Sequence, residues 1–171
     1  KNYPLFKDYA AGWLKEKERT VKESTYKGYE QLVRVNLLPA FGEMTLKEIT
    51  RKEVQDLLFS YADQGKNRTA QKLKVMLTAM FDVIVSDYPK LTNPMGKIVL
   101  NHYEVKKGCA FTKDEEKQII DFCKQHPHYH GNSALLLLMY TGMRVGELKT
   151  AEYDGQYITC ISEKTRKGRK E

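Results

Sequence analysis

The sequence predicts a mainly α-helical protein, with a four-helix bundle at residues 1–96 and the first part of an α+β domain at residues 111–171. Three observations support this fold class. Apolar residues recur at helical spacing in four successive segments of the first part. Residues 97–110 have no helical stripe and carry several charges, so we expect a linker there. The second part combines helical segments with one strand-like segment.

The first two helices are predicted from their apolar stripes and end signals. The first follows Pro4, which suits a first helical turn. Its stripe consists of Phe6, Tyr9, Ala10, Trp13 and Leu14. The second is expected to be capped by Ser24 and to end near Pro39 and Gly42. Its stripe consists of Tyr26, Tyr29, Val33 and Leu37.

The third and fourth helices complete the bundle. Thr50 and Glu53 have the spacing of a capping box at the start of the third helix, and Gly65 ends it. The fourth is predicted over residues 68–88, before Pro89. Its stripe consists of Leu73, Leu77, Met80, Phe81 and Ile84. Because short turns join these amphipathic helices, they can bury their stripes only against one another.

The second part begins with another capping box, formed by Thr112 and Glu115. A buried helix is expected at residues 133–140, followed directly by the segment TGMRVGEL at residues 141–148. Beyond a turn at Asp154 and Gly155, residues 156–162 mix β-branched, aromatic and polar side chains and predict a strand.

Composition limits the classes of function. Lys and Arg outnumber Asp and Glu by 29 to 22, and a pI near 9.2 suits a polyanionic partner such as nucleic acid. The three cysteines are widely spaced, which argues against a disulfide framework and favours a reducing, cytoplasmic compartment. No apolar run is long enough to cross a membrane. Three alternating histidines, at 126, 128 and 130, predict a polar loop without metal.

Arg144 is the strongest candidate for chemistry. Gly142 is placed to end the preceding helix in a left-handed turn, which would hold Arg144 on a short rigid segment. A guanidinium held in this way matches two oxygens of a phosphate. An alternative is a surface ion pair between Arg144 and Glu147, worth only about a few tenths of a kcal/mol.

The segment TGMRVGEL resembles the first signature box of the tyrosine recombinases, TG-x-R-x-x-E-L. The resemblance implies that Arg144 binds the scissile phosphate and that Glu147 supports the active site. The family also places a catalytic lysine in a β-hairpin shortly after this arginine. Lys164 in ITCISEKTRKGRK matches best and would act as general acid toward the leaving 5′-hydroxyl; Lys167 is the competing candidate. A solvated basic turn is the alternative, and it would still favour a nearby phosphate backbone.

Residues 1–96 resemble the SAM-like core-binding domain of phage integrases through the order of four motifs. They are Trp13-Leu14, VKESTY at 21–26, LPAFG at 38–42 and LKEIT at 46–50. The resemblance implies a core-binding bundle that packs on the major groove, followed by a truncated α+β tyrosine-recombinase catalytic domain. Residues expected to contact DNA are Lys22, Ser24, Thr25 and Lys27 at the second helix, Asn67, Arg68, Thr69 and Lys72 at the fourth, and Lys167. Alternatively, Ser24 and Thr69 merely cap helices.

The resemblance implies a bacterial or phage-encoded site-specific recombinase or integrase that cleaves and religates DNA through a 3′-phosphotyrosine. It implies no metal or nucleotide cofactor, and a tetramer on two duplexes. The family's second box, with His-x-x-Arg, and its nucleophilic tyrosine belong beyond Glu171. We therefore expect this chain to bind double-stranded DNA without cleaving it, and to be a monomer without DNA. Alternatives are a non-catalytic DNA-binding or regulatory protein derived from a recombinase, and a helical protein-interaction module.

Overall fold

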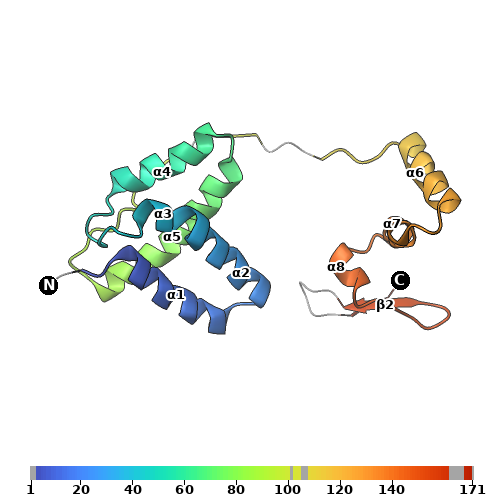
Figure 1. Cartoon of the computed structure of the whole chain (residues 1–171), viewed down its shortest axis with the longest axis horizontal. Helices are drawn as coiled ribbons and strands as arrows, with labels where there is room; N and C mark the ends of the chain where they lie inside the picture. The colour runs from blue at the N-terminus through green and yellow to red at the C-terminus, as the bar shows by residue number, and fades with distance from the viewer. Residues whose placement is uncertain (1–2, 101, 105–107, 162–167, 171) are drawn as a thin grey trace. The chain divides into compact units, whose positions relative to one another are not determined.

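The computed structural model describes residues 3–100, 102–104, 108–161 and, for the backbone, 168–170. The chain divides into two compact units, Lys1–Val105 and Lys106–Glu171. The first unit is helical, and the second combines helices with a small sheet (Figure 1). The mainly α fold class is therefore confirmed.

The four predicted helical segments of the first unit are all present. The helices are α1 (Phe6–Thr20), α2 (Glu23–Leu32), η1 (Val33–Leu37), α3 (Leu38–Phe41), α4 (Arg51–Asp63) and α5 (Asn67–Asp87). The predicted second helix is thus one run made of α2, η1 and α3, which ends at Gly42 as expected. A Cβ at Gly42 would lie 2.6 Å from the carbonyl oxygen of Leu38, so only glycine fits this end without rearrangement.

The core of this unit combines residues of the predicted stripes with residues outside them, such as Phe41, Leu46 and Ile49. Phe6, Phe81 and Leu73 are at most 1% exposed, and apolar residues from α1, η1, α3, α4 and α5 surround them. One difference is that α2 itself contributes no buried residue, since Tyr26 and Tyr29 are only half-buried. Most side chains of α2 are therefore exposed, including Ser24, Thr25 and Gln31.

The π-helical segment η1 was not expected from the sequence. The Leu38 N–H donates to the Val33 carbonyl, five residues back, and this wider turn precedes Pro39, which has no N–H to donate. Val33 and Leu37 remain buried in the core, at 1% and 0% exposed. The wide turn therefore lets the helix continue past Pro39 while its apolar residues stay in the core.

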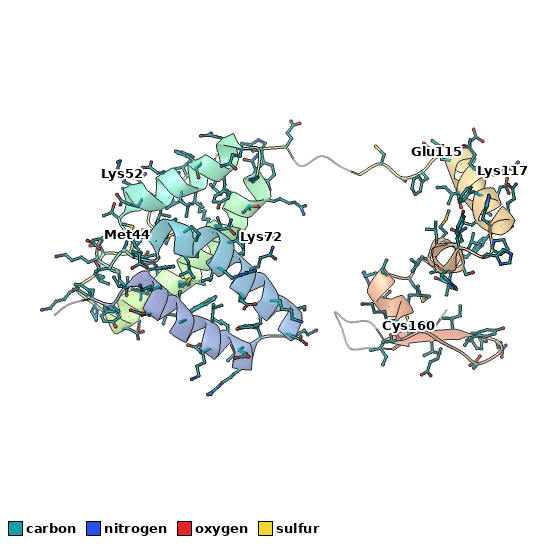
Figure 2. The ribbon with its side chains drawn as sticks, viewed as in Figure 1. Met44, Lys52, Lys72, Glu115, Lys117 and Cys160 are labelled. Atoms are coloured by element: carbon teal, nitrogen blue, oxygen red, sulfur yellow. The ribbon has the colours of Figure 1, made fainter. Side chains whose placement is uncertain are left out.

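The structure corrects two expected caps and confirms two others. Lys22 and Lys66 occupy the cap positions of α2 and α5, so neither Ser24 nor Thr69 caps a helix. The capping boxes of α4 and α6 are both present. In the second of these, the Glu115 carboxylate accepts from the Thr112 N–H at 2.8 Å. Glu115 lies on α6 (Figure 2).

The expected linker at 97–110 does not begin at residue 97. Ile98 is 6% exposed and belongs to the core of the helical unit. Side chains of α4 and α5 satisfy the backbone around it: the Gln55 amide donates to the Val99 carbonyl at 2.7 Å and accepts from its N–H at 3.0 Å, and Lys74 Nζ donates to the Ile98 carbonyl at 2.9 Å. We call residues 97–100 the strap. Residues 97–100 lack a helical stripe and were therefore assigned to the linker. Their backbone is instead hydrogen-bonded by side chains of α4 and α5, which the sequence pattern does not reveal.

The described residues of the second unit form three helices and a sheet. Its elements are α6 (Lys113–Gln125), α7 (His130–Thr141), α8 (Val145–Leu148), β1 (Glu152–Tyr153), β2 (Ile158–Ile161) and β3 (Gly168–Lys170). The strands are antiparallel in the order β1-β2-β3. The expected buried helix is α7, but none of its residues is buried: Leu135 is 41% and Tyr140 65% exposed. Its apolar side chains are covered only in part, chiefly by α6.

Candidate nucleic-acid interface and catalytic turn

The turn that carries Arg144 is rigidly built. Gly142 ends α7 in the predicted left-handed conformation, at φ 63° and ψ 16°, and donates to the Leu138 carbonyl at 2.9 Å. Met143 is 6% exposed and anchors the turn. Arg144 then adopts an extended conformation at the cap position of α8. The backbone on both sides of the arginine is therefore fixed.

A buried carboxylate orients the Arg144 side chain. Glu147 is 2% exposed, and its carboxylate accepts from the Arg144 N–H at 2.8 Å and from Nη1 at 2.9 Å. The Arg144 side chain itself is 64% exposed. This differs from the surface ion pair considered above, because one partner is buried and holds the other. The guanidinium is anchored through Nη1, and the side chain is otherwise largely open to solvent.

Thr150 connects the arginine turn to the sheet. Its hydroxyl donates to the Glu147 carbonyl at 3.1 Å and accepts from the Ile161 N–H at 3.1 Å. Ile161 is the last residue of β2 and pairs with Gly168 of β3. Lys164 and Lys167 come between these two strands in sequence and lie outside the described residues. The strand that leads to both lysines is thus tied to α8.

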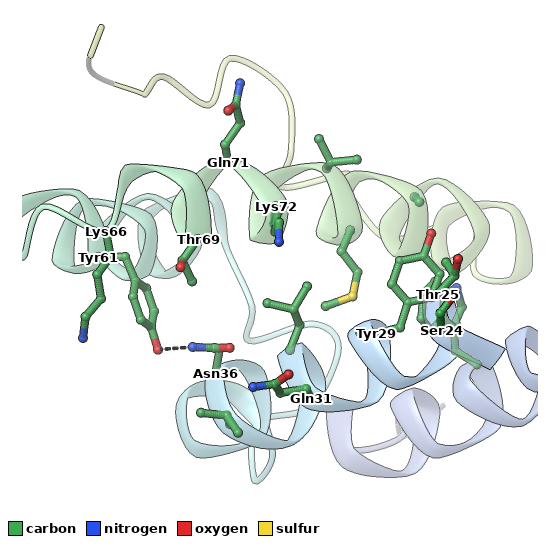
Figure 3. Close-up of a pocket in the computed structure, with 17 residues that line it drawn as sticks. Ser24, Thr25, Tyr29, Gln31, Asn36, Tyr61, Lys66, Thr69, Gln71 and Lys72 are labelled. Atoms are coloured by element: carbon green, nitrogen blue, oxygen red, sulfur yellow. Dashed lines mark hydrogen bonds between the residues drawn. The ribbon is translucent and has the colours of Figure 1, made fainter. Parts of the chain in front are cut away.

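A groove of about 770 Å³ lies on the helical unit between α2, η1 and α5 (Figure 3). Four of the predicted DNA-contacting residues line it: Ser24, Thr25, Thr69 and Lys72. Because neither Ser24 nor Thr69 caps a helix, both hydroxyls are available to this groove. Lys22, Lys27, Asn67 and Arg68 are not among its lining residues.

Lys27 is instead paired on the outside of α2. Its ammonium lies 2.6 Å from the Glu23 carboxylate, one helical turn earlier. The hydrogen bond to Glu23 raises the pKa of Lys27 and lowers that of Glu23. Part of the positive charge expected for DNA contact at this position is therefore already compensated.

Several groove residues were missed by the sequence reasoning. They are the polar side chains of Gln31, Asn36, Tyr61, Lys66 and Gln71. The Asn36 amide donates to the Tyr61 hydroxyl at 2.8 Å and links η1 to α4 (Figure 3). The helical spacing of Ser24, Gly28 and Gln31 was the available signal, because these positions share a face of α2 that carries no core residue.

The charged side chains that line the groove in the described residues are all positive. The chain contains 22 acidic residues, yet none of those that the structure describes lines the groove, whereas Lys66 and Lys72 do. A hollow lined by hydroxyls, amides and ammonium groups favours an anionic ligand.

The part of the chain that the structure describes contains no group of three His, Cys, Asp or Glu residues that could hold a metal ion. His126 stacks between Phe122 and Tyr129, with ring centroids 4.3 and 5.8 Å away. Within the same residues, no helix has the length and apolarity needed to span a membrane.

Comparison with known proteins identifies relatives. A family model for the phage integrase N-terminal SAM-like domain matches residues 5–60. Over 130 residues, 76% of this chain, the integrase of Enterobacteria phage 434 is 27% identical. The integrase of Escherichia phage lambda is 26% identical over the same length. The chain spans 36% of the length of each relative.

Solved structures share the fold. A lambda integrase tetramer bound to a Holliday junction matches 99% of this chain and 51% of its own chain, with a TM-score of 0.84 and 24% identity. The Tn1549 transposon integrase, in complex with a circular intermediate DNA, matches 95% of this chain and 59% of its own, with a TM-score of 0.72 and 19% identity. The matched SAM-like domain and the phage integrase relatives support a tyrosine recombinase family, and the solved structures show that the chain shares their fold.

Proposed function

We propose that this chain is the part of a site-specific DNA recombinase that binds the DNA duplex and the scissile phosphate. The helical unit acts as the core-binding domain, and residues from 111 onward begin the catalytic domain. The observation that carries the proposal is the Arg144 guanidinium, held through Nη1 by buried Glu147 on a side chain that is otherwise largely exposed. A donor fixed before the substrate arrives stabilises developing charge without reorganisation.

In the proposed reaction, a tyrosine hydroxyl of the full protein attacks the phosphodiester. A 3′-phosphotyrosyl bond forms as the bond from phosphorus to the 5′-oxygen breaks. Arg144 stabilises the negative charge on the pentacoordinate phosphate, and Glu147 is its positioning residue. Lys164, or alternatively Lys167, gives a proton to the leaving 5′-oxygen. Tyr153 and Tyr157 precede this hairpin in the sequence and are not proposed as the nucleophile.

The proposed partner is double-stranded DNA, bound at the groove between α2, η1 and α5, where no described lining residue is acidic. Lys66 and Lys72 supply phosphate contacts, and Ser24, Thr25 and Thr69 supply hydroxyls. The lambda integrase structure is a tetramer on a Holliday junction, and we propose the same assembly for the full protein on two duplexes. Without DNA, the chain is expected to be monomeric.

The groove is tested by duplex binding at several salt concentrations. We expect Lys72→Ala to weaken binding to any duplex and to reduce the slope of log K against log[salt] by about one, because one phosphate contact is lost. Lys52→Ala is the matched control, since Lys52 projects from α4 with its side chain 81% exposed (Figure 2). Equal slopes for the two variants would exclude the groove as the DNA site.

The arginine turn is tested in the same assay with Arg144→Ala. We expect a similar loss of slope, because Arg144 contacts a phosphate. The control is Arg34→Ala, which removes an exposed arginine of η1 outside the groove. If both variants bind alike while Lys72→Ala is weakened, a non-catalytic DNA-binding role is favoured. The unaltered chain, incubated with a nicked duplex, is expected to form no covalent adduct.

A further inference from the structure

The groove of the helical unit contains features that phosphate binding does not explain. Gln31 is an exposed amide on α2, and Val35, 53% exposed, lies one helical turn further along. Val75, 68% exposed, faces the same groove from α5. Phosphates need cations and hydroxyls, whereas exposed methyl groups beside an amide suit the edges of bases.

Gln31 is the amide of this groove that is left for a ligand. Asn36 donates to the Tyr61 hydroxyl, and Gln71 accepts from the Tyr103 hydroxyl at 3.0 Å. Gln31 has no hydrogen-bond partner among the residues that the structure describes. In Figure 3, Gln71 points away from α2, whereas Lys72 points toward it.

We propose that Gln31 reads adenine in the DNA major groove and that this groove thereby selects A·T over G·C base pairs. The inference rests on the proposed DNA-binding function and adds its sequence preference. A glutamine amide presents an N–H donor beside a carbonyl acceptor, so that the N–H can donate to N7 of adenine while the oxygen accepts from its N6 amino group. The valine methyls provide an apolar surface for the thymine methyl group.

The rest of the lining agrees with this preference. Among the described residues that line the groove there is no arginine, the usual partner of guanine, and no carboxylate that would accept from cytosine. Lys66 and Lys72 can hold the backbone on either strand without regard to sequence. Lysine can also contact guanine, so the role of Lys72 is decided within the experiment.

The experiment selects duplexes from a randomised pool with the whole chain at one salt concentration. We expect at least one position enriched in A·T. Gln31→Ala should abolish that enrichment, with A-over-G discrimination falling by about fivefold to a hundredfold, while its affinity for unselected duplexes stays within about twofold. Gln71→Ala, a matched amide in the same groove that is held by Tyr103, should keep the enrichment.

The outcomes separate this inference from the proposed function. Enrichment in G·C, enrichment that survives in Gln31→Ala, or enrichment lost only in Lys72→Ala would overturn adenine reading while leaving DNA binding intact. Binding without any base preference would do the same. If the unaltered chain selects no duplex at all, the proposed DNA-binding function itself fails. Circular dichroism of each variant verifies that the helices are retained.

Discussion

The two units of this chain are stabilised in different ways. The helical unit buries apolar side chains from α1, η1, α3, α4 and α5 in one continuous core. In the second unit, the described residues bury few side chains, namely Cys123, Met143, Glu147 and Cys160. Polar links hold its parts instead: the capping box of α6, the Arg144–Glu147 pair and the Thr150 hydroxyl. The helical unit is a packed scaffold, whereas the arginine turn depends on a few hydrogen bonds.

The largest expected effect comes from a cavity in the helical core. Phe81→Ala should lower the free energy of unfolding of this unit by about 3–5 kcal/mol, because a fully buried ring is removed. Trp13 is the only tryptophan and lies in this core, so its fluorescence during urea unfolding reports on this unit. Leu135→Ala in α7 is the control and should leave the Trp13 transition unchanged. A shared shift would show that the two units unfold together.

An intermediate effect is expected at the arginine turn. Glu147→Gln leaves one amide oxygen where two carboxylate oxygens accept from Arg144, and should weaken the turn by about 2 kcal/mol. Hydrogen exchange of the Leu148 N–H, which donates to the Arg144 carbonyl, should then accelerate more than tenfold. Glu152→Gln, at an exposed carboxylate of β1, is the control. Equal exchange in both variants would mean that Glu147 does not hold the turn.

The smallest effect is expected at the strap. Gln55→Ala removes both side-chain bonds to Val99 and should cost about 1 kcal/mol, because water replaces the lost partners. The Val99 N–H should exchange faster, while the Trp13 transition shifts only slightly. Gln118→Ala, an exposed glutamine of α6, should change neither quantity. An unchanged Val99 exchange rate would contradict the pairing that attaches the strap to α4.

Sequence periodicity was sufficient to predict the helices and much of the core, because burial of one face dictates both. The capping boxes of Thr50 and Thr112 were equally local and were confirmed. Features that depend on tertiary partners were missed: the π turn before Pro39, and the strap paired by Gln55. Apolar composition alone made α7 look buried, since it does not reveal how much surface its neighbours cover.

The site was predicted in part for the same reason. Glycine and arginine in TGMRVGEL indicated the turn, but the burial of Glu147 is a tertiary property. In the groove, Ser24, Thr25, Thr69 and Lys72 were chosen from helix starts, whereas Gln31 and Asn36 lie further along. The face that Gln31 shares with Ser24 and Gly28 was a signal that was not used, and Asn36 had no local signal of its own. The roles of Lys164 and Lys167 stay predictions.

The Thr150 hydroxyl has a mechanical consequence. Because it bonds to the backbone of Glu147 on one side and of Ile161 on the other, α8 and the end of β2 cannot separate without breaking a hydrogen bond. A force that bends the β2–β3 ribbon is therefore transmitted to the guanidinium, and a pull on the guanidinium reaches the ribbon. Arg144 and the end of β2 would then move together.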